Sequence, residues 1–430
     1  MSLYSGLKKN KLLTLFLVLF SAFTTYGQIS FDYLSTSDKF NDRFLVENRL
    51  ENLKTTKYKK EFRKIYKQQA LHLEQKVKDS TYIASSLLTD MIATLQQEIS
   101  KSNPTFRNIS DIQIRVNTSN RVNARCFGNG CIELNLGLME RLNSRAELCF
   151  VLCHEISHYL ENHSEKQLVY RFGYNRTPGN KKKIEEIKSD KVHQLENTKD
   201  YVFKRSNDFN SWSRKYEFQA DSLGMALFQK TSFKQTEGIQ ALAKLDHEAF
   251  QWKTPMPWKA LFSEYTQKET PVKKKKFLFQ LSHFESIDST NTQKLIGTHP
   301  ELDQRIDRLK KEFSISETHK LPDHEYQKFK DQLRQLAIQV ALDQKKIHIA
   351  FYRSAIAYTN PDLQHQKTFY KKMIAKSLES VYSLKKTHTI GSYIPYEDAV
   401  FNSENLNKVA AFLHELQLSE LENMIKHFNN

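Results

Sequence analysis

Apolar residues recur at helical spacing along most of this chain. From residue 28 to about residue 101 the pattern predicts helices, of which the clearest is the amphipathic stretch SSLLTDMIATLQQEIS. Glycine and proline, which interrupt helices, supply only 11 and 9 of the 430 residues. We therefore expect a mainly helical α+β protein.

Strand-like alternation is confined to a short central part of the chain. The segment DIQIRV, residues 111–116, alternates with a period of two, and two more short strands flank the turn FGNG. We expect these three strands to form a small antiparallel sheet. Helical spacing returns after residue 309 and predicts a helical C-terminal region over residues 311–430.

The first 27 residues have the features of a signal peptide. Lysines precede the apolar run LLTLFLVLFSAF, and small residues stand at Thr25 and Gly27. We predict cleavage after Gly27 and therefore an exported protein, either periplasmic or secreted. The alternative is an uncleaved N-terminal anchor, which the shortness of the apolar run disfavours. No later segment approaches 18 apolar residues, so a soluble mature protein is expected.

The chain is strongly basic. Its formal net charge is +16, which becomes +13 without the three lysines of the signal segment. The densest cluster, PVKKKKF at residues 271–277, is interpreted as a solvated face near a turn or as a peripheral contact with an anionic membrane surface. Nucleic acid is not an expected partner, because no recognition motif is present.

The four cysteines lie close together in the sequence: Cys126, Cys131, Cys149 and Cys153. Export would permit disulfides. Cys126 and Cys131 flank the FGNG turn, so we predict a disulfide between the two strands that it joins. The other two are one helical turn apart on an apolar face and are interpreted as packed thiols.

One helix carries an unusual density of histidine. Ser144, followed three residues later by Glu147, is typical of a helix start. The segment that follows, RAELCFVLCHEISHYLEN, has a wide apolar face, which indicates a buried helix. His154 and His158 are four residues apart and project to one side, and Glu155 reaches the same space. A polar patch on a helix remains the alternative interpretation.

This is the HExxH pattern, in which two histidines bind zinc and the glutamate is a general base. Catalytic zinc also needs a third protein ligand and an open position for water. His163, five residues after His158, is about 140° further round the helix and is expected to point away from these histidines. Thr177 and Pro178 stand where another known arrangement carries its glutamate. The third ligand is therefore expected further along the chain.

The segment SRKYEFQADSLGMALF predicts a second helix with two carboxylates on one face. Glu217 and Asp221 are four residues apart, and Ala220 and Gly224 form a small-residue stripe that would allow close packing on the first helix. We interpret Glu217 as the third zinc ligand and Asp221 as a hydrogen-bond acceptor for a ligand histidine. Taken alone, Glu217 would be a surface glutamate.

The order of these motifs resembles that of a known family. RVNARCFGNGCIELNLGLMERLNSRAEL, HEISH, EFQAD and GTHPELDQRIDRL together resemble the HtpX and CAAX prenyl protease type of zinc metallopeptidase, within the gluzincins. The resemblance covers about residues 88–309. It implies a gluzincin-like core with one zinc ion held by His154, His158 and Glu217, and with Glu155 as general base.

The resemblance also assigns roles around the zinc site. It implies that Asp221 accepts a hydrogen bond from the outer nitrogen of His154, and that His299 helps to stabilise the oxyanion. On the alternative interpretation, His299 is a turn residue before a proline. The strand around Asn123 and Ala124 would be the edge that pairs with an extended substrate. Many relatives have transmembrane helices, so the lack of such segments here makes a lipid-embedded prenylated substrate an unexpected one.

These inferences define an organisation and a function. We expect a signal peptide over residues 1–27 and a metallopeptidase domain over residues 28–310, with a helical N-terminal part (28–101) and a catalytic core (102–310). Within the core, a Lys-rich insert over residues 163–210 gates the cleft or is a mobile spacer. A helical C-terminal region follows over residues 311–430. The predicted function is a zinc-dependent endopeptidase acting on proteins or peptides. The alternative is a zinc-binding envelope assembly or chaperone-like factor, which would not need the base Glu155.

Overall fold

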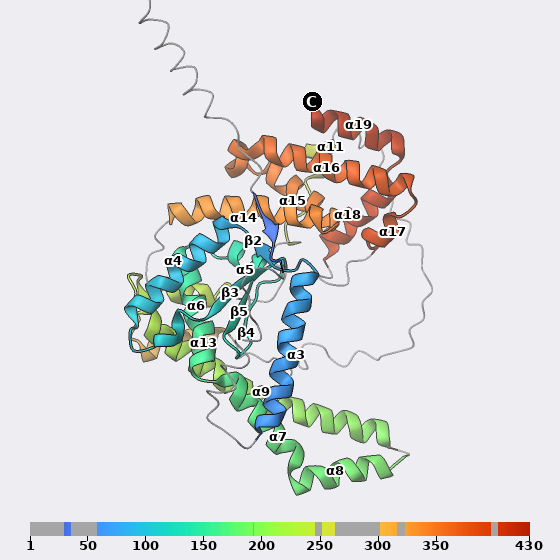
Figure 1. The fold of residues 1–430 in the computed structure, drawn as a ribbon. Helices are drawn as coiled ribbons and strands as arrows, with labels where there is room; N and C mark the ends of the chain where they lie inside the picture. The colour runs from blue at the N-terminus through green and yellow to red at the C-terminus, as the bar shows by residue number, and fades with distance from the viewer. Residues whose placement is uncertain are drawn as a thin grey trace, which may run out of the picture. The chain divides into compact units, whose positions relative to one another are not determined.

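The computed structural model describes residues 30–35, 58–191, 193–245, 252–262, 302–315, 323–396 and 403–430 (Figure 1). The predicted signal peptide, the lysine cluster and His299 lie outside these residues. The chain divides into two compact units, one of residues 31–250 and 269–337 and one of residues 1–30, 251–268 and 338–430. The described elements confirm a mainly helical α+β fold.

The first unit contains a three-stranded sheet made of β3 (Gln113–Asn117), β4 (Ala124–Cys126) and β5 (Cys131–Asn135) in the order β3-β5-β4. The hairpin of β4 and β5 is antiparallel, but β3 runs parallel to β5, so the expectation of an all-antiparallel sheet is wrong for β3. The connection after β3 leads to β4 at the opposite edge of the sheet, and β4 runs antiparallel to β3. The hairpin turn then reverses the chain, so the central strand β5 runs parallel to β3.

A buried asparagine fixes this crossover. The side-chain amide of Asn117 donates to Oδ1 of Asn135 at 2.7 Å, and its own oxygen accepts from the backbone N–H of Ser119 at 2.8 Å. The carbonyl of Ser119 in turn accepts from the N–H of Gly137 at 2.9 Å. These bonds join the ends of β3 and β5 to the connection between them.

The hairpin turn does not carry the predicted disulfide. Its register pairs Cys126 with Ile132, and adjacent residues of a strand point to opposite faces, so Cys126 and Cys131 lie on opposite sides of the sheet. Both residues are thiols in this structure, and the prediction of a disulfide is therefore wrong. Gly128 adopts a positive φ of 76° in the turn, and a Cβ atom there would lie 2.6 Å from the Cβ of Ser164.

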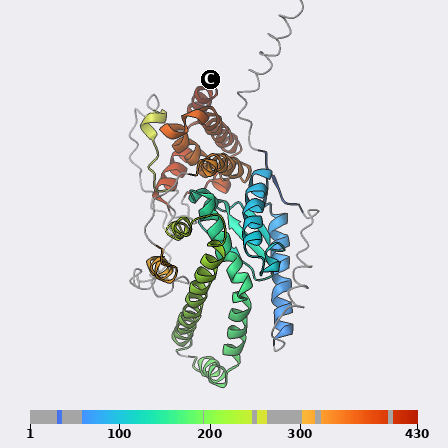
Figure 2. The same ribbon diagram turned by 90° about the vertical axis from the view of Figure 1, so that its left-hand side faces the viewer.

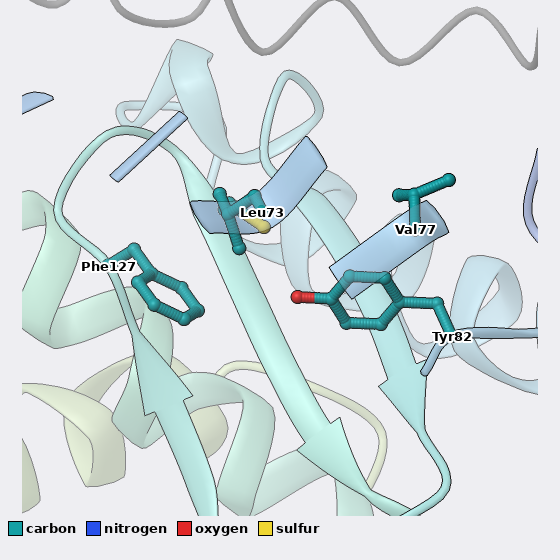
Figure 3. Packing of buried hydrophobic residues seen from close by; sticks show 5 residues of the cluster. Leu73, Val77, Tyr82 and Phe127 are labelled. Atoms are coloured by element: carbon teal, nitrogen blue, oxygen red, sulfur yellow. The ribbon is translucent and has the colours of Figure 1, made fainter. Parts of the chain in front are cut away.

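Helix α3 (Lys59–Lys78) covers one face of the sheet. Its residues Leu73 and Val77 pack with Tyr82, Phe127 and Cys131, as Figure 3 shows. Beside this cluster, the buried carboxylate of Glu133 on β5 accepts from the Lys76 ammonium and from the Tyr82 hydroxyl, both at 2.6 Å. The short strands β1 (Asp32–Tyr33) and β2 (Ile83–Ala84) form a separate antiparallel pair.

The central helix of this unit is α6 (Arg145–Leu160). The hydroxyl of Ser144 accepts from the N–H of Glu147 at 3.1 Å, and the Glu147 carboxylate accepts from the N–H of Asn143. The predicted capping interaction is thus present, except that the Glu147 carboxylate accepts from the N–H of Asn143 and not from that of Ser144. Helices α4 (Ser86–Ser102) and α10 (Gln235–Leu242) pack on α6, which is buried at most of its positions.

The Lys-rich insert is helical in the described residues. It forms α7 (His163–Arg176), α8 (Pro178–Ser189) and the first half of α9 (Gln194–Phe228). Figure 2 shows α7 and α9 extending away from the sheet, with α8 between their far ends. Phe172 of α7 packs edge-on against the Phe62 ring of α3, and Arg176 pairs with Glu61 at 2.5 Å. These contacts attach the insert to α3.

The second unit is helical throughout its described part. Its elements are α11 (Trp258–Phe262), the end of α14 (His324–Asp343), α15 (Ile347–Thr359), η3 (Pro361–Gln366), α16 (Lys367–Lys386), α17 (Ile390–Tyr393), α18 (Glu404–Glu415) and α19 (Leu418–Asn429). Rings of Phe262, Phe351, Phe412 and Phe428 form its aromatic core. Among the described residues of either unit, no helix combines the length and apolarity needed to cross a bilayer.

Candidate metal centre

Two helices meet at the HExxH segment because one of them carries a glycine at the crossing point. A Cβ atom built on Gly224 of α9 would lie 3.1 Å from both N and Cα of His154 on α6. Such a distance is too short for any side chain to enter without moving a helix. Ala220, one turn earlier, is fully buried. The small-residue stripe therefore sets the approach of α9 to α6, as the sequence predicts.

Three donor groups converge where these helices cross. The Nε2 atoms of His154 and His158 are 3.2 Å apart. Oε2 of Glu217 lies 3.5 Å from Nε2 of His154, and Oε1 of Glu217 lies 3.5 Å from Nε2 of His158. Within the described part of the chain, these three residues form a group of possible metal ligands, with donor atoms all within 4.8 Å of one another.

The donor set fits zinc. Zinc bonded at about 2.0–2.1 Å to imidazole nitrogen and carboxylate oxygen, in tetrahedral geometry, holds its donor atoms about 3.3 Å apart. The observed separation of 3.2 Å between the two histidine nitrogens agrees with that value, and each nitrogen has an oxygen of Glu217 3.5 Å away. Three protein donors also leave one position of a tetrahedron for water, which is the composition of catalytic zinc sites.

Asp221 and Arg305 lie behind the first of these histidines. Nδ1 of His154 is 3.0 Å from Oδ1 of Asp221, the carboxylate that the sequence places on the same face as Glu217. The guanidinium of Arg305, on α13 (Leu302–Glu312), donates two hydrogen bonds of 2.7 Å to Asp221 and lies 3.6 Å from Glu217. A bidentate arginine fixes the plane of the carboxylate, which in turn orients His154.

Burial and charge act in opposite directions on this group of residues. Burial alone would lower the pKa of His154, but the carboxylates of Asp221 and Glu217 raise it to about 10. Burial would raise the pKa of Asp221, but Arg305 and, to a smaller extent, His154 outweigh burial and lower it. Burial and the neighbouring His154 lower the pKa of His158 to about 3. The carboxylates thus attract positive charge to the point where the Nε2 atoms meet.

His163 does not point away from the site, so that expectation is wrong. It assumed that α6 continues, whereas α6 ends at Leu160 and Asn162 turns the chain with φ 56° and ψ 38°. The turn places Nδ1 of His163 3.0 Å from Nδ1 of His158. Burial, with a contribution from Lys166, lowers the pKa of His163 to about 4, so the ring is neutral near pH 7.

The predicted general base lies on the same buried helix. Glu155 is 8% exposed. Burial alone would lower the pKa of Arg305, but Asp221, Glu217 and, to a smaller extent, Glu155 raise it. The glutamate is therefore close enough to the ligand group to interact with its arginine. His299, the predicted oxyanion-stabilising residue, lies outside the described residues.

The predicted substrate-binding residues lie on and beside an edge strand. Strand β4 is the last strand of its sheet within the described residues, and α6 packs against it. The carbonyl of Asn123 accepts from the N–H of Asn135 at 3.1 Å, so its backbone faces β5. Because backbone groups alternate along an antiparallel pair, the N–H and C=O of Ala124 face the open edge. Ala124, and not Asn123, offers its backbone there.

Sequence reasoning did not identify Arg305 or His163 as site residues. The signal for Arg305 was present, because it is the first arginine of the motif GTHPELDQRIDRL, but the motif does not say which carboxylate it binds. The position of His163 depends on where α6 ends. The signal in the sequence was Asn162 itself, because asparagine is, after glycine, a common residue in the left-handed conformation that follows a helix end.

Comparison with known proteins agrees with this geometry. The model of a family described as peptidase family M48 matches residues 92–313, which is more than half of the chain. The matched region includes α6, α9 and α13, the helices that carry the convergent residues. A search of curated proteins found no match. The family match confirms the resemblance to zinc metallopeptidases of the HtpX and CAAX protease types.

Proposed function

This chain belongs to peptidase family M48, a family of zinc metallopeptidases, and we propose that it is an exported endopeptidase that hydrolyses proteins or peptides. The observation that carries the proposal is the convergence of His154, His158 and Glu217 beside a buried glutamate that follows the first histidine. A purely structural zinc site would have no need for that base.

The residues divide the work of hydrolysis between them. A zinc ion held by the two histidines and Glu217 would lower the pKa of a bound water towards about 7 and polarise the substrate carbonyl. Glu155 accepts the proton of the attacking water and returns it to the leaving amine. Asp221, held by Arg305, orients His154 so that its Nε2 faces the other ligands.

An extended substrate fits the open edge beside α6. A polypeptide lying along β4 would exchange backbone hydrogen bonds with Ala124, which orients the chain without selecting its sequence. We propose this pairing for an unfolded segment of a protein substrate. The role of His299 at the oxyanion remains a sequence-based proposal.

Export and any contact with anionic membranes rest on the sequence. The signal-like first 27 residues support a periplasmic or secreted location, and the basic composition supports contact with acidic surfaces. A second function, a zinc-binding assembly factor with little proteolysis, draws support from the helical unit outside the family match.

The proposal is tested by zinc content and cleavage together. Purified protein is incubated with an unfolded exported protein, with and without a zinc chelator, and zinc is measured by elemental analysis. Glu217→Ala should lose bound zinc and cleavage, while the control Glu186→Ala, an exposed glutamate of α8, should keep both. Undiminished zinc in Glu217→Ala would remove Glu217 from the ligand set. Wild-type protein that holds zinc but cuts nothing would favour the assembly factor.

A further inference from the structure

His163 has three directional contacts and almost no exposure to solvent. Its ring is 1% exposed and stacks on Tyr216, with centroids 4.6 Å apart and planes inclined by 23°. Its Nε2 atom lies 3.3 Å from Oε1 of Gln219, and its Nδ1 atom lies 3.0 Å from Nδ1 of His158. The ring, on the first residue of α7, is therefore held by the ligand-bearing part of α9 on one side and by His158 of α6 on the other.

These contacts determine which nitrogens carry protons. The side-chain oxygen of Gln219 can only accept, so Nε2 of the His163 ring carries a proton. A His158 ring that binds a metal through Nε2 carries its own proton on Nδ1, so Nδ1 of His163, 3.0 Å away, has the lone pair that accepts it. Only one of the two Nδ1 atoms at 3.0 Å can donate, so the donor is His158. Nε2 of His158 is left with its lone pair directed toward the other ligands.

We propose that His163 is a positioning residue for the metal ligand His158, with Gln219 fixing its tautomer. The two ligand histidines then have different supports. His154 has a carboxylate, Asp221, whose charge Arg305 balances, and His158 has the neutral pair of His163 and Gln219. A neutral support fixes the ring without adding another buried negative charge, which would be costly here.

The inference rests on zinc binding at the proposed active site, and its test uses zinc affinity rather than cleavage. Zinc dissociation constants are measured by competition with a chromophoric chelator, after circular dichroism has confirmed the fold of each metal-free variant. His163→Phe keeps a flat ring against Tyr216 but has no acceptor, and its zinc affinity should fall about 10- to 100-fold. His163→Asn can place an amide oxygen near the position of Nδ1 and should stay within about threefold of wild type.

The role of Gln219 supplies an independent arm. Gln219→Leu should weaken zinc binding in the wild-type background and have little further effect in the His163→Phe background, because both act through one hydrogen-bonded chain. The cobalt-substituted His163→Phe protein should also show a changed visible absorption spectrum, since the coordination of His158 is disturbed.

The outcomes separate this inference from the proposed function. Wild-type protein without stoichiometric zinc would contradict the function itself. Wild type that binds zinc, together with His163→Phe within threefold of it, would overturn only the inference. If His163→Phe does not fold, Gln219→Leu decides the question. An unchanged zinc affinity in that variant would contradict the proposed support of His158 by His163 and Gln219.

Discussion

The crossing of α9 over α6 can be tested by adding one methyl group. In Gly224→Ala, the new Cβ would lie 3.1 Å from the backbone N and Cα of His154, whereas ordinary contacts begin at 3.4 Å. Both helices have rigid backbones there, so α9 must move by a few tenths of an ångström. Glu217 is two turns away on the same face of α9 and moves with it.

The magnitude follows from two opposed effects. Alanine is better than glycine inside a helix by about 1 kcal/mol. Forcing an extra carbon into a packed interior costs about 1–3 kcal/mol. We therefore expect Gly224→Ala to lower the free energy of unfolding by up to about 2 kcal/mol. Displacing Glu217 relative to the histidines should weaken zinc binding by about tenfold, the lower end of the effect of losing a support behind a metal ligand.

The chain offers a matched control in Gly173, inside α7. A Cβ atom there meets only the Tyr58 hydroxyl at 3.9 Å, an ordinary contact. Gly173→Ala should stabilise the protein by about 1 kcal/mol and leave zinc affinity unchanged. Urea unfolding of the metal-free proteins and chelator competition measure the two quantities. If Gly224→Ala behaves like Gly173→Ala in both, the close approach does not set the site.

Three further predictions concern other parts of the account. Asp221→Asn should weaken zinc binding about 10- to 100-fold in chelator competition, because a neutral amide supports His154 less well; unchanged affinity would contradict this. Asp323 accepts from the N–H groups of Arg145 and Tyr326, which lower its pKa against the opposing effect of burial. Asp323→Ala should therefore cost about 1 kcal/mol at pH 7, with the full difference present above about pH 4 and lost as the pH falls through the lower folded pKa, as urea unfolding at several pH values would show. Mass spectrometry of protein from the native host should give Gln28 as the first residue, and a retained N-terminal segment would exclude cleavage.

Features set by the geometry of a single helix could be predicted from the sequence. The Ser144 cap, the shared side of His154 and His158, and the Gly224 stripe follow from 3.6 residues per turn and from residue size. Convergence of Glu217 on the histidines required the two helices to pack, and the small residues indicated that they could.

The incorrect predictions all depended on a change of direction of the chain. Asn162 ends α6 and returns His163 to the site, and the hairpin register separates Cys126 from Cys131. The parallel direction of β3 follows from a crossover that Asn117 stabilises by long-range hydrogen bonds. Turns and strand order depend on such contacts, so periodicity alone could not supply them.

The role of Glu155 as the general base of a zinc peptidase is tested by the substitution Glu155→Gln. This substitution keeps the length of the side chain while removing the proton acceptor. The rate of cleavage of an unfolded protein substrate is compared for wild type, Glu155→Gln and the control Glu186→Gln, an exposed residue of α8. We predict that Glu155→Gln retains zinc and fold and loses about 100- to 10,000-fold in rate, while the control cuts normally. Cleavage by zinc-loaded Glu155→Gln at the wild-type rate would contradict the account.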